Sequence, residues 1–162
     1  GCRRGETFVT RKITSAVARI FHGSNEKIYL GNLNAKRDWG DAEDYTESMW
    51  KMLQQKKPDD YVIATGKSYS VREFVREAFS NINIDIKWRG SGLNEYGYDS
   101  KSRKVYIKIS KIYFRPTEVY ELRGDSRKAK RVLKWKPKID FKKMVKKMVN
   151  FDIDNYGKTN FY

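Results

Sequence analysis

Two side chains of opposite charge stand three residues apart within the segment Tyr113 to Pro137. Arg115 directly precedes a proline, which favours extended backbone for its predecessor, so we expect Arg115 to project from a loop. Glu118 follows it, upstream of a predicted helix for which Asp125 is the expected N-cap. A fixed arginine beside a carboxylate suits recognition of phosphate groups and sugar hydroxyls. The alternative interpretation is an ordinary surface ion pair.

Two further cations lie where predicted elements begin or end. Lys12 falls in the first turn of a predicted helix, where free backbone N–H groups also favour an anion. Arg37 lies on a predicted loop beside a strand end, the region where α/β sheets bind ligands. Together with Arg115, these cations could hold a pyrophosphate if the fold brings them together. The alternative is three unrelated surface charges.

The motifs of several catalytic chemistries do not occur in this sequence. There is no G-x-G-x-x-G, no G-x-S-x-G, no phosphate loop ending in Gly-Lys-Ser/Thr, and no Tyr-x-x-x-Lys among the eleven tyrosines. Cys and His residues do not form a metal-ligand pattern, so we predict no metal site. The sequence therefore offers binding groups and no catalytic centre.

The elements that must position these groups follow from the hydrophobic periodicity. We expect a helix from Thr10 with Gly23 as its C-cap, and a short strand from Lys27 to Gly31. A second helix is expected over Ala42 to Gln55. Its buried stripe is expected to comprise Ala42, Tyr45, Met49 and Leu53.

The middle of the chain contains a short apolar run and a helix start. The run Tyr61 to Thr65 is typical of a strand buried on both faces of a parallel sheet. Ser70 and Glu73 form a predicted capping box for the next helix. The inward residues of that helix are expected to be Val71, Phe74, Val75, Ala78, Phe79 and Ile82.

Later strands are expected at Ile84 to Arg89 and Lys104 to Ile109, separated by a polar insert, Gly90 to Arg103, that we expect to be mobile. Asp140 is the predicted N-cap of a last helix that runs to about Phe151. Residues 155–162 show no periodicity. Alternating helices and strands, followed by these later strands, predict an α/β unit with a small α+β lobe.

Composition limits the class of protein. With 39% hydrophobic residues and four tryptophans among 162 residues, the chain can bury a core. The net charge of +15 raises the possibility of nucleic-acid binding. However, Lys142, Lys143, Lys146 and Lys147 fall opposite an apolar stripe, which indicates a solvated helix face. We therefore predict no specific nucleic-acid partner.

The sequence also bears on location. The single cysteine suits a reducing compartment, and neither a membrane-length apolar run nor a signal-peptide pattern occurs. We expect a cytoplasmic protein without a membrane partner. The first residue is Gly and not Met, which points to a chain cut from a longer one.

Four sequence motifs follow one another in the order found in a known enzyme family. They are RRGETFVTRKIT (Arg3 to Thr14), YLGNLNAKRDWGDAEDY (Tyr29 to Tyr45), PDDYVIATG with SVREFV (Pro58 to Val75), and FRPTEV followed by L-x-G-D and K-A-K-x-x-L-x-W-K-P. From Arg3 to about Val149, the chain resembles the GDP-mannose 4,6-dehydratases. These are nucleotide-sugar enzymes of the extended short-chain dehydrogenase superfamily.

The resemblance implies a substrate site built from five residues of this chain. By the motifs that they match, Val9 and Lys12 would lie against the GDP moiety. Arg37 and Arg115 would contact the diphosphate, and Glu118 would bind ribose hydroxyls. GDP-mannose is the implied substrate, converted with loss of water to GDP-4-dehydro-6-deoxymannose.

The resemblance also implies a cofactor, a fold and an assembly. NADP would carry the hydride, and Arg4 matches a position associated with the NADP site. The implied fold is the C-terminal part of a Rossmann-like NAD(P)-binding extended short-chain dehydrogenase. Outer parallel strands and helices would occupy about 8–82 and a small α+β substrate-binding lobe about 83–151, within a homo-oligomer (dimer or tetramer).

The family's glycine-rich NADP turn and its catalytic Thr, Glu, Tyr and Lys belong to the N-terminal half. None of them matches a position here, so we predict that these residues alone bind substrate without catalysing the reaction. Two alternatives stay open. One is another nucleotide-sugar epimerase or reductase of the superfamily, and the other is a non-enzymatic basic binding module.

Overall fold

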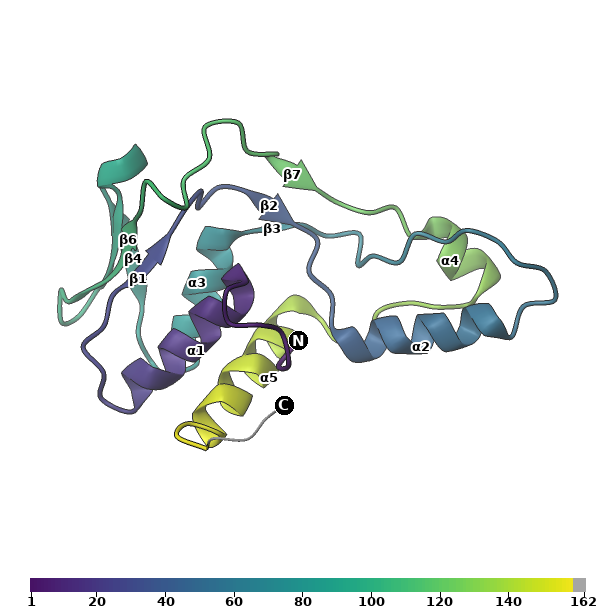
Figure 1. Cartoon of the computed structure of the whole chain (residues 1–162), viewed down its shortest axis with the longest axis horizontal. Coiled ribbons are helices and arrows are strands. Elements are labelled where there is room, and N and C mark those ends of the chain that lie inside the picture. Colours follow the sequence, from purple (N-terminus) through teal and green to yellow (C-terminus); the bar gives the residue numbers. More distant parts are fainter. Residues whose placement is uncertain (159–162) are drawn as a thin grey trace.

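The larger of two sheets has the strand order β1-β6-β5-β4 (Figure 1). Its strands are β1 (Ile28–Leu30), β6 (Val105–Ile109), β5 (Tyr96–Asp99) and β4 (Ile86–Arg89). β1 runs parallel to β6, whereas β5 pairs antiparallel with both β6 and β4. The structure, a computed structural model of the chain, describes residues 1–158.

Two helices, α1 (Val9–Phe21) and α3 (Val71–Ser80), pack against this sheet, and a third, α5 (Phe141–Asp154), packs against both of them (Figure 1). One core joins the helices and the strands, so residues from both predicted regions, 8–82 and 83–151, share it. Its fully buried side chains include Ile13, Val17, Phe74, Val75, Phe79, Ile86, Ile107, Val145 and Val149.

Local capping sets the limits of these helices. The Ser70 side chain accepts a hydrogen bond from the backbone of Glu73, and the Glu73 carboxylate accepts one from the backbone of Ser70. This confirms the predicted capping box of α3. Asp140 caps α5 by accepting from Lys143 N at 2.8 Å. α1 ends one residue earlier than predicted, with His22 as its C-cap, and Gly23 follows with a φ of 97°, in the left-handed region that glycine adopts without strain.

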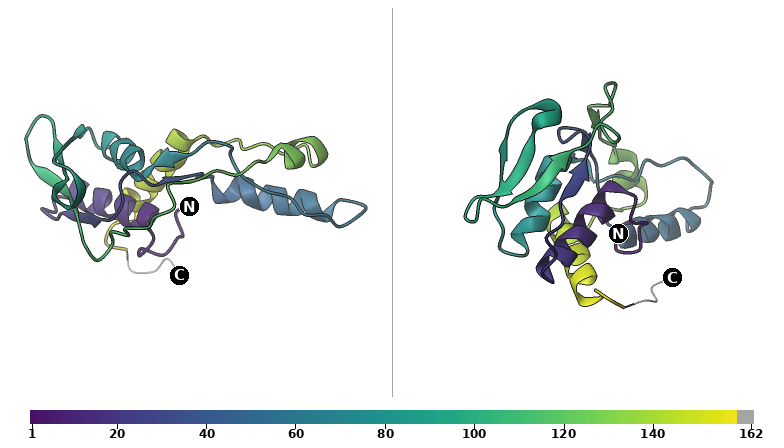
Figure 2. Two further views of the ribbon diagram at one scale, coloured as in Figure 1. Left: turned by 90° about the horizontal axis from the view of Figure 1, so that it is seen from above. Right: turned by 60° about the vertical axis from the view of Figure 1, so that its left-hand side comes forward.

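The second sheet is small and joins distant parts of the chain. β2 (Lys36–Arg37) lies between β3 (Tyr69–Ser70), antiparallel to it, and β7 (Glu121–Leu122), parallel to it. The prediction of a plain loop around Arg37 is therefore wrong, because that residue lies on a strand. The sheet connects the three-helix layer to an arm that extends from it (Figures 1 and 2).

The arm consists of α2 (Ala42–Leu53), α4 (Arg127–Val132) and the chain that leads into α5. Trp135 is the centre of a second, smaller core, where its Nε1 donates to Asp44 O at 2.8 Å. The buried Asp44 carboxylate accepts from the backbone N–H groups of Lys138 and Ile139, both at 2.9 Å.

Of the predicted inward stripe of α2, only Tyr45 packs against a core, and the other three residues are exposed. Met49 and Leu53 are 61% and 82% exposed, while the buried residues of the helix are Asp44 and Ser48. Long-range contacts explain the difference. The N–H groups of the backbone that leads into α5 donate to the Asp44 carboxylate, so the side of α2 that carries Asp44 faces inward. Hydrophobic periodicity alone predicted that the apolar face of α2 would be buried.

The predicted strand at Tyr61 to Thr65 does not form among the described residues. No described strand runs beside it, and the N–H groups of Thr65 and Gly66 donate instead to the Asp38 carboxylate, at 2.9 and 2.8 Å. Ala64 is buried against Gly124. The segment is extended but lacks strand partners.

The insert from Gly90 to Arg103 was predicted to be a mobile loop, and this prediction is wrong. It contains β5, in the interior of the larger sheet, and a short 3₁₀ turn over Gly92–Asn94. Gly97 explains why the strand was missed, since a Cβ there would come within 2.9 Å of Trp88 and 3.0 Å of Ile107. Gly97 weakens the strand pattern in the sequence, but the close packing of Trp88 and Ile107 leaves room only for glycine at this position.

Two smaller predictions need comment. α4 begins after Ser126, not Asp125, although the Asp125 carboxylate accepts from Arg127 N at 3.0 Å. Lys147 is not simply solvated, because it pairs with Asp41 and Glu43.

Residues 159–162, part of the segment predicted to lack periodicity, lie outside the described residues. Within the described part of the chain, no helix combines the length and apolar character needed to cross a membrane.

Candidate nucleotide-sugar site

A cavity of about 260 Å³ lies at the junction of α1, β1, β2 and the segment after β6. All five residues predicted to bind substrate line it: Val9, Lys12, Arg37, Arg115 and Glu118. They come from segments more than a hundred residues apart, yet the fold brings them to one hollow. The alternative of unrelated surface charges does not describe this geometry.

Arg37 is the most firmly held cation of the cavity. Its guanidinium donates to the backbone oxygens of Lys36 at 2.7 Å and Val119 at 2.9 Å. It also pairs with Glu118, with 2.7 Å between Nη2 and Oε1. The alternative interpretation of the sequence paired Glu118 with Arg115, only three residues away. The structure instead joins Glu118 to a residue 81 positions distant, which orients both groups on one wall.

Lys12 lines the cavity from the first turn of α1. Its ammonium lies 3.7 Å from the centre of the Tyr113 ring, a cation–π contact. No side chain caps the start of α1, and its first turn carries no acidic residue. The free N–H groups of that turn therefore add positive potential beside Val9 and Lys12.

Arg115 lies on an exposed loop, as its position before proline predicts. Its backbone is fixed by Asn32, which follows β1. Among residues 1–158, the Arg115 guanidinium has no hydrogen-bond or ion-pair partner. It is thus the one predicted diphosphate-binding arginine whose charge is uncommitted within that part of the chain.

Sequence reasoning missed two residues of the site, Asn32 and Tyr113. Both line the cavity and both contact a predicted binding residue. The only sequence signal was their presence inside the GNL and YFRPT stretches. Gly31 also matters, because a Cβ there would collide with the backbone oxygen of Tyr113. β1 and the segment before Arg115 can therefore approach closely only at a glycine.

Asp38 holds together the backbone beneath β2. Its carboxylate accepts from Thr65 N, Thr65 Oγ1 and Gly66 N, and from Gly124 N at 3.3 Å. Two backbone segments, Thr65 to Gly66 and the one at Gly124, are thereby tied to the residue that follows Arg37. The position of Arg37 depends on this junction.

Arg4 lies outside the cavity. Its guanidinium stacks 3.6 Å above the Phe8 ring and lines a separate hollow that also contains Asp41 and Lys147. Nearby, Arg11 anchors the start of α1 by pairing with the buried Asp152 at 3.0 Å. Burial raises the pKa of the Asp152 carboxyl, while hydrogen bonding by Thr14 and the charge of Arg11 act in the opposite direction.

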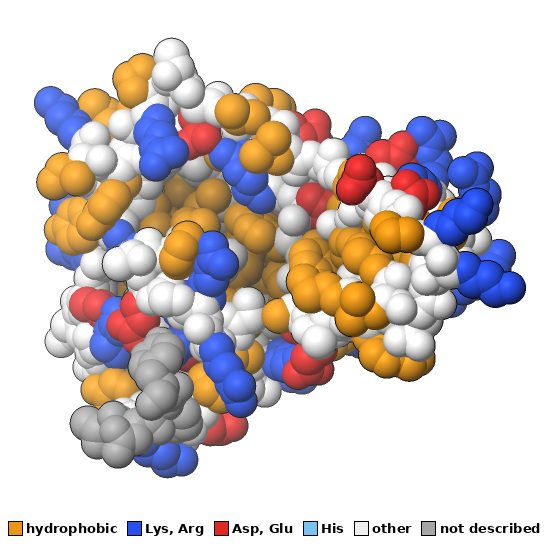
Figure 3. Space-filling view, turned by 45° about the vertical axis from the view of Figure 1, so that its right-hand side comes forward, with side chains coloured by type: hydrophobic (Ala, Val, Ile, Leu, Met, Phe, Trp, Pro, Cys, Tyr) orange, Lys and Arg blue, Asp and Glu red, His pale blue; other side chains and the backbone are white. Residues whose placement is uncertain are grey.

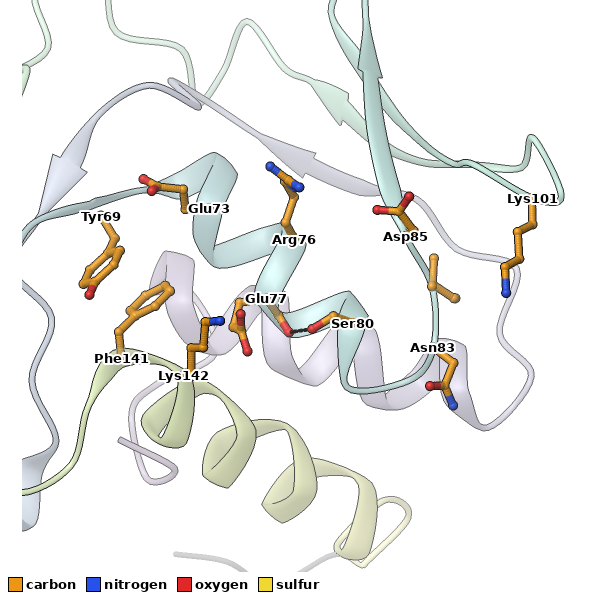
Figure 4. Close-up of a pocket in the computed structure, with 11 residues that line it drawn as sticks. Tyr69, Glu73, Arg76, Glu77, Ser80, Asn83, Asp85, Lys101, Phe141 and Lys142 are labelled. Carbon is orange, nitrogen blue, oxygen red and sulfur yellow. Dashed lines mark hydrogen bonds between the residues drawn. The ribbon is translucent and has the colours of Figure 1, made fainter.

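A further cavity, of about 510 Å³, lies between α3, the start of α5 and the beginning of β4 (Figure 4). Figure 4 shows charges of both signs around it, among them Glu77, Arg76 and Lys142. None of the predicted site residues lines it. Within residues 1–158, no group of three His, Cys, Asp or Glu side chains is arranged to hold a metal ion.

Comparison with known proteins identifies relatives over nearly the whole chain. A sequence model of the family described as GDP-mannose 4,6 dehydratase matches residues 1–148. The GDP-mannose 4,6 dehydratases of Dictyostelium discoideum and Homo sapiens are 59% and 51% identical over 94% of this chain. The chain covers 43% and 41% of those two proteins, so it spans about two fifths of their length.

Solved structures agree on the fold. RMD from Pseudomonas aeruginosa complexed with NADPH aligns with a TM-score of 0.76 at 17% identity, covering 96% of this chain and 46% of that one. The dTDP-glucose 4,6-dehydratase of Bacillus anthracis in complex with NAD gives 0.71 at 15%, over 96% and 42%. At these identities the likeness concerns the fold alone. The chain therefore has the α/β fold of a part of each of these two proteins, a little under half of their length.

Proposed function

We propose that this chain, which belongs to the GDP-mannose 4,6-dehydratase family, is the part of such an enzyme that binds the GDP-sugar. The complete protein would convert GDP-mannose to GDP-4-dehydro-6-deoxymannose with loss of water. The observation that carries the proposal is the meeting of Val9, Lys12, Arg37, Arg115 and Glu118 around one cavity.

The chemistry of the cavity suits a nucleoside diphosphate sugar. Three cations and the start of α1 supply positive charge for the two phosphates, and Arg115 offers a guanidinium without a protein partner among the described residues. Glu118 supplies a carboxylate that can accept hydrogen bonds from ribose hydroxyls. Because Arg37 already neutralises part of its charge, Glu118 can lie beside a diphosphate without strong repulsion.

A nicotinamide cofactor forms part of the proposal, since two structures of the same fold contain NADPH or NAD. NADP is the form that we propose here. The exposed Arg4 guanidinium, stacked on Phe8 and without a carboxylate partner in the described residues, fits a phosphate of that cofactor. When bound, the cofactor would accept and return the hydride. The residues of this chain would bind and orient the sugar nucleotide.

We also propose a cytoplasmic homo-oligomer, a dimer or a tetramer, as the form of the complete protein. The alternative activities are those of another nucleotide-sugar epimerase or reductase. The identities of 49–59% to GDP-mannose dehydratases favour the dehydratase. A basic module that binds nucleic acid is the remaining alternative, and it predicts binding that weakens steeply with salt.

The test compares two substitutions in the complete protein. Arg115→Ala should weaken GDP-mannose binding by roughly tenfold to a hundredfold, because it removes a charge-assisted hydrogen bond worth about 1.5–3 kcal/mol. Lys142→Ala removes an exposed cation outside the cavity and should change binding by less than about twofold. Isothermal titration calorimetry measures both. Equal effects of the two substitutions would show that the site is assigned wrongly.

A further inference from the structure

Asn32 and the backbone of Arg115 form a two-point contact across 83 residues of sequence. Asn32 Nδ2 donates to Arg115 O at 2.9 Å, and Arg115 N donates to Asn32 Oδ1 at 2.8 Å. The side-chain amide thus satisfies both polar groups of one residue's backbone. Asn32 follows Gly31 directly after β1, so it is attached to the larger sheet.

Asn32 is the side chain that binds the backbone of Arg115 itself. Before Arg115, Ser110 N donates to Leu30 O at 2.8 Å, and Ser110 O accepts from Phe114 N at 2.9 Å, so the chain is held to β1 up to Phe114. After Arg115, the backbone is next held at Val119, whose oxygen accepts from Arg37. The exposed guanidinium itself has no partner among residues 1–158. The Asn32 amide is therefore the direct restraint on the backbone that aims this guanidinium.

We infer that Asn32 is a positioning residue for the sugar-nucleotide site, acting through Arg115 to orient its guanidinium toward the diphosphate. This inference rests on the proposed function. A long, exposed arginine loses conformational freedom when it binds a ligand, and a backbone already fixed reduces that cost. An asparagine is suited to the task because one amide both donates and accepts in the required geometry.

Three roles of Asn32 predict different binding data: positioning of Arg115, direct contact with the ligand, and a purely structural role. If Asn32 acts through Arg115, its removal matters only while the Arg115 guanidinium is present. If Asn32 bound the ligand itself, its removal would weaken binding equally in an Arg115→Ala background. If it served stability alone, ligand affinity would not change in the folded variant.

The experiment is a double-mutant cycle in the complete protein, with binding measured by calorimetry. Asn32→Ala should weaken GDP-mannose binding about threefold to tenfold, corresponding to the loss of preorganisation at one charged contact. In the Arg115→Ala background, the same substitution should cost less than about twofold. Guanosine, which lacks phosphates, should bind Asn32→Ala and the wild-type protein equally.

Asn34→Ala is the matched control. Asn34 lies two residues away, accepts hydrogen bonds from Arg72 and does not line the cavity. Its removal should leave GDP-mannose binding unchanged. If Asn32→Ala melts too low for titration, Asn32→Ser replaces it, because a single hydroxyl cannot span both backbone groups.

The outcomes are distinct for each hypothesis. Additive losses in the cycle, or an Asn32 variant that binds GDP-mannose normally while Arg115→Ala does not, overturn the inference about Asn32. An Arg115→Ala protein that binds GDP-mannose like the wild type overturns the proposed function instead. A loss for Asn32→Ala that disappears in the Arg115→Ala background, with guanosine binding intact, supports the inference.

Discussion

At the scale of single residues, carboxylates do as much as the cations to build this site. Glu118 orients Arg37, Asp38 ties two backbone segments together beside it, and Asp152 anchors Arg11 at the start of α1. Each of these acids has partners within the protein. The proposed diphosphate-binding groups are therefore held by a framework in which charges are already paired.

Asp38 offers a clear test of that framework. Asp38→Ala would leave the N–H groups of Thr65, Gly66 and Gly124 without their acceptor. Because Thr65 and Gly124 are half-buried, losing their shared acceptor should lower the free energy of unfolding by roughly 1–3 kcal/mol. Asp60→Ala, at an exposed position, should change it by less than about 0.5 kcal/mol. Urea unfolding of the complete protein measures the free energy of unfolding of both variants. An Asp38→Ala protein as stable as the wild type would contradict the conclusion that Asp38 holds these segments together.

At the scale of elements, helix starts differ in how they are capped, and this difference has a measurable consequence. α3 begins with a reciprocal capping box, whereas the N-cap of α4, Ser126, makes no side-chain cap hydrogen bond. The same residue type thus occupies two N-cap positions with different roles.

Ser70→Ala should therefore destabilise the protein by about 0.5–2 kcal/mol, the usual cost of losing a side-chain cap. Ser126→Ala serves as the matched control and should have almost no effect, because its hydroxyl caps nothing. Thermal unfolding gives the comparison, and hydrogen exchange at the first turn of α3 localises it. Equal destabilisation by the two substitutions would refute the assignment of the cap.

At the scale of the whole molecule, the arm exposes an apolar face. Met49, Trp50 and Leu53 project from α2 into solvent, and hydrophobic side chains gather on the surface of the arm in Figure 3. Large exposed apolar patches on a protein mark surfaces that are covered in its working state. The extended segment Tyr61 to Thr65, which lacks strand partners among the described residues, lies on the same arm.

The 162 residues alone are therefore expected to behave poorly in solution. Each large apolar side chain left in water forfeits roughly 1.5–3 kcal/mol, and unpaired extended backbone favours self-association. We expect binding of an apolar dye and aggregates in size-exclusion chromatography. Trp50→Gln with Leu53→Gln should reduce both, since neither residue belongs to a core. A monodisperse monomer that binds no dye would contradict this and favour a self-folding binding module.

Some features were determined by the sequence itself. The capping box at Ser70 and the N-cap at Asp140 depend on residues within one turn of each other, so local pattern was enough to predict them. The inward faces of α3 and α5 followed from periodicity, because these helices pack in the main core. The resemblance supplied the set of site residues. Their individual roles remain predictions.

Other features were decided only by tertiary structure. Glu118 pairs with Arg37, and Asn32 with the backbone of Arg115, across more than 80 residues of sequence. α2 turns Asp44 inward because a distant backbone needs its carboxylate, and β5 contains Gly97 because Trp88 packs closely against it. Hydrophobic periodicity predicts which side chains are buried away from water. It does not predict which distant polar groups must be paired or where two segments of backbone must pack closely.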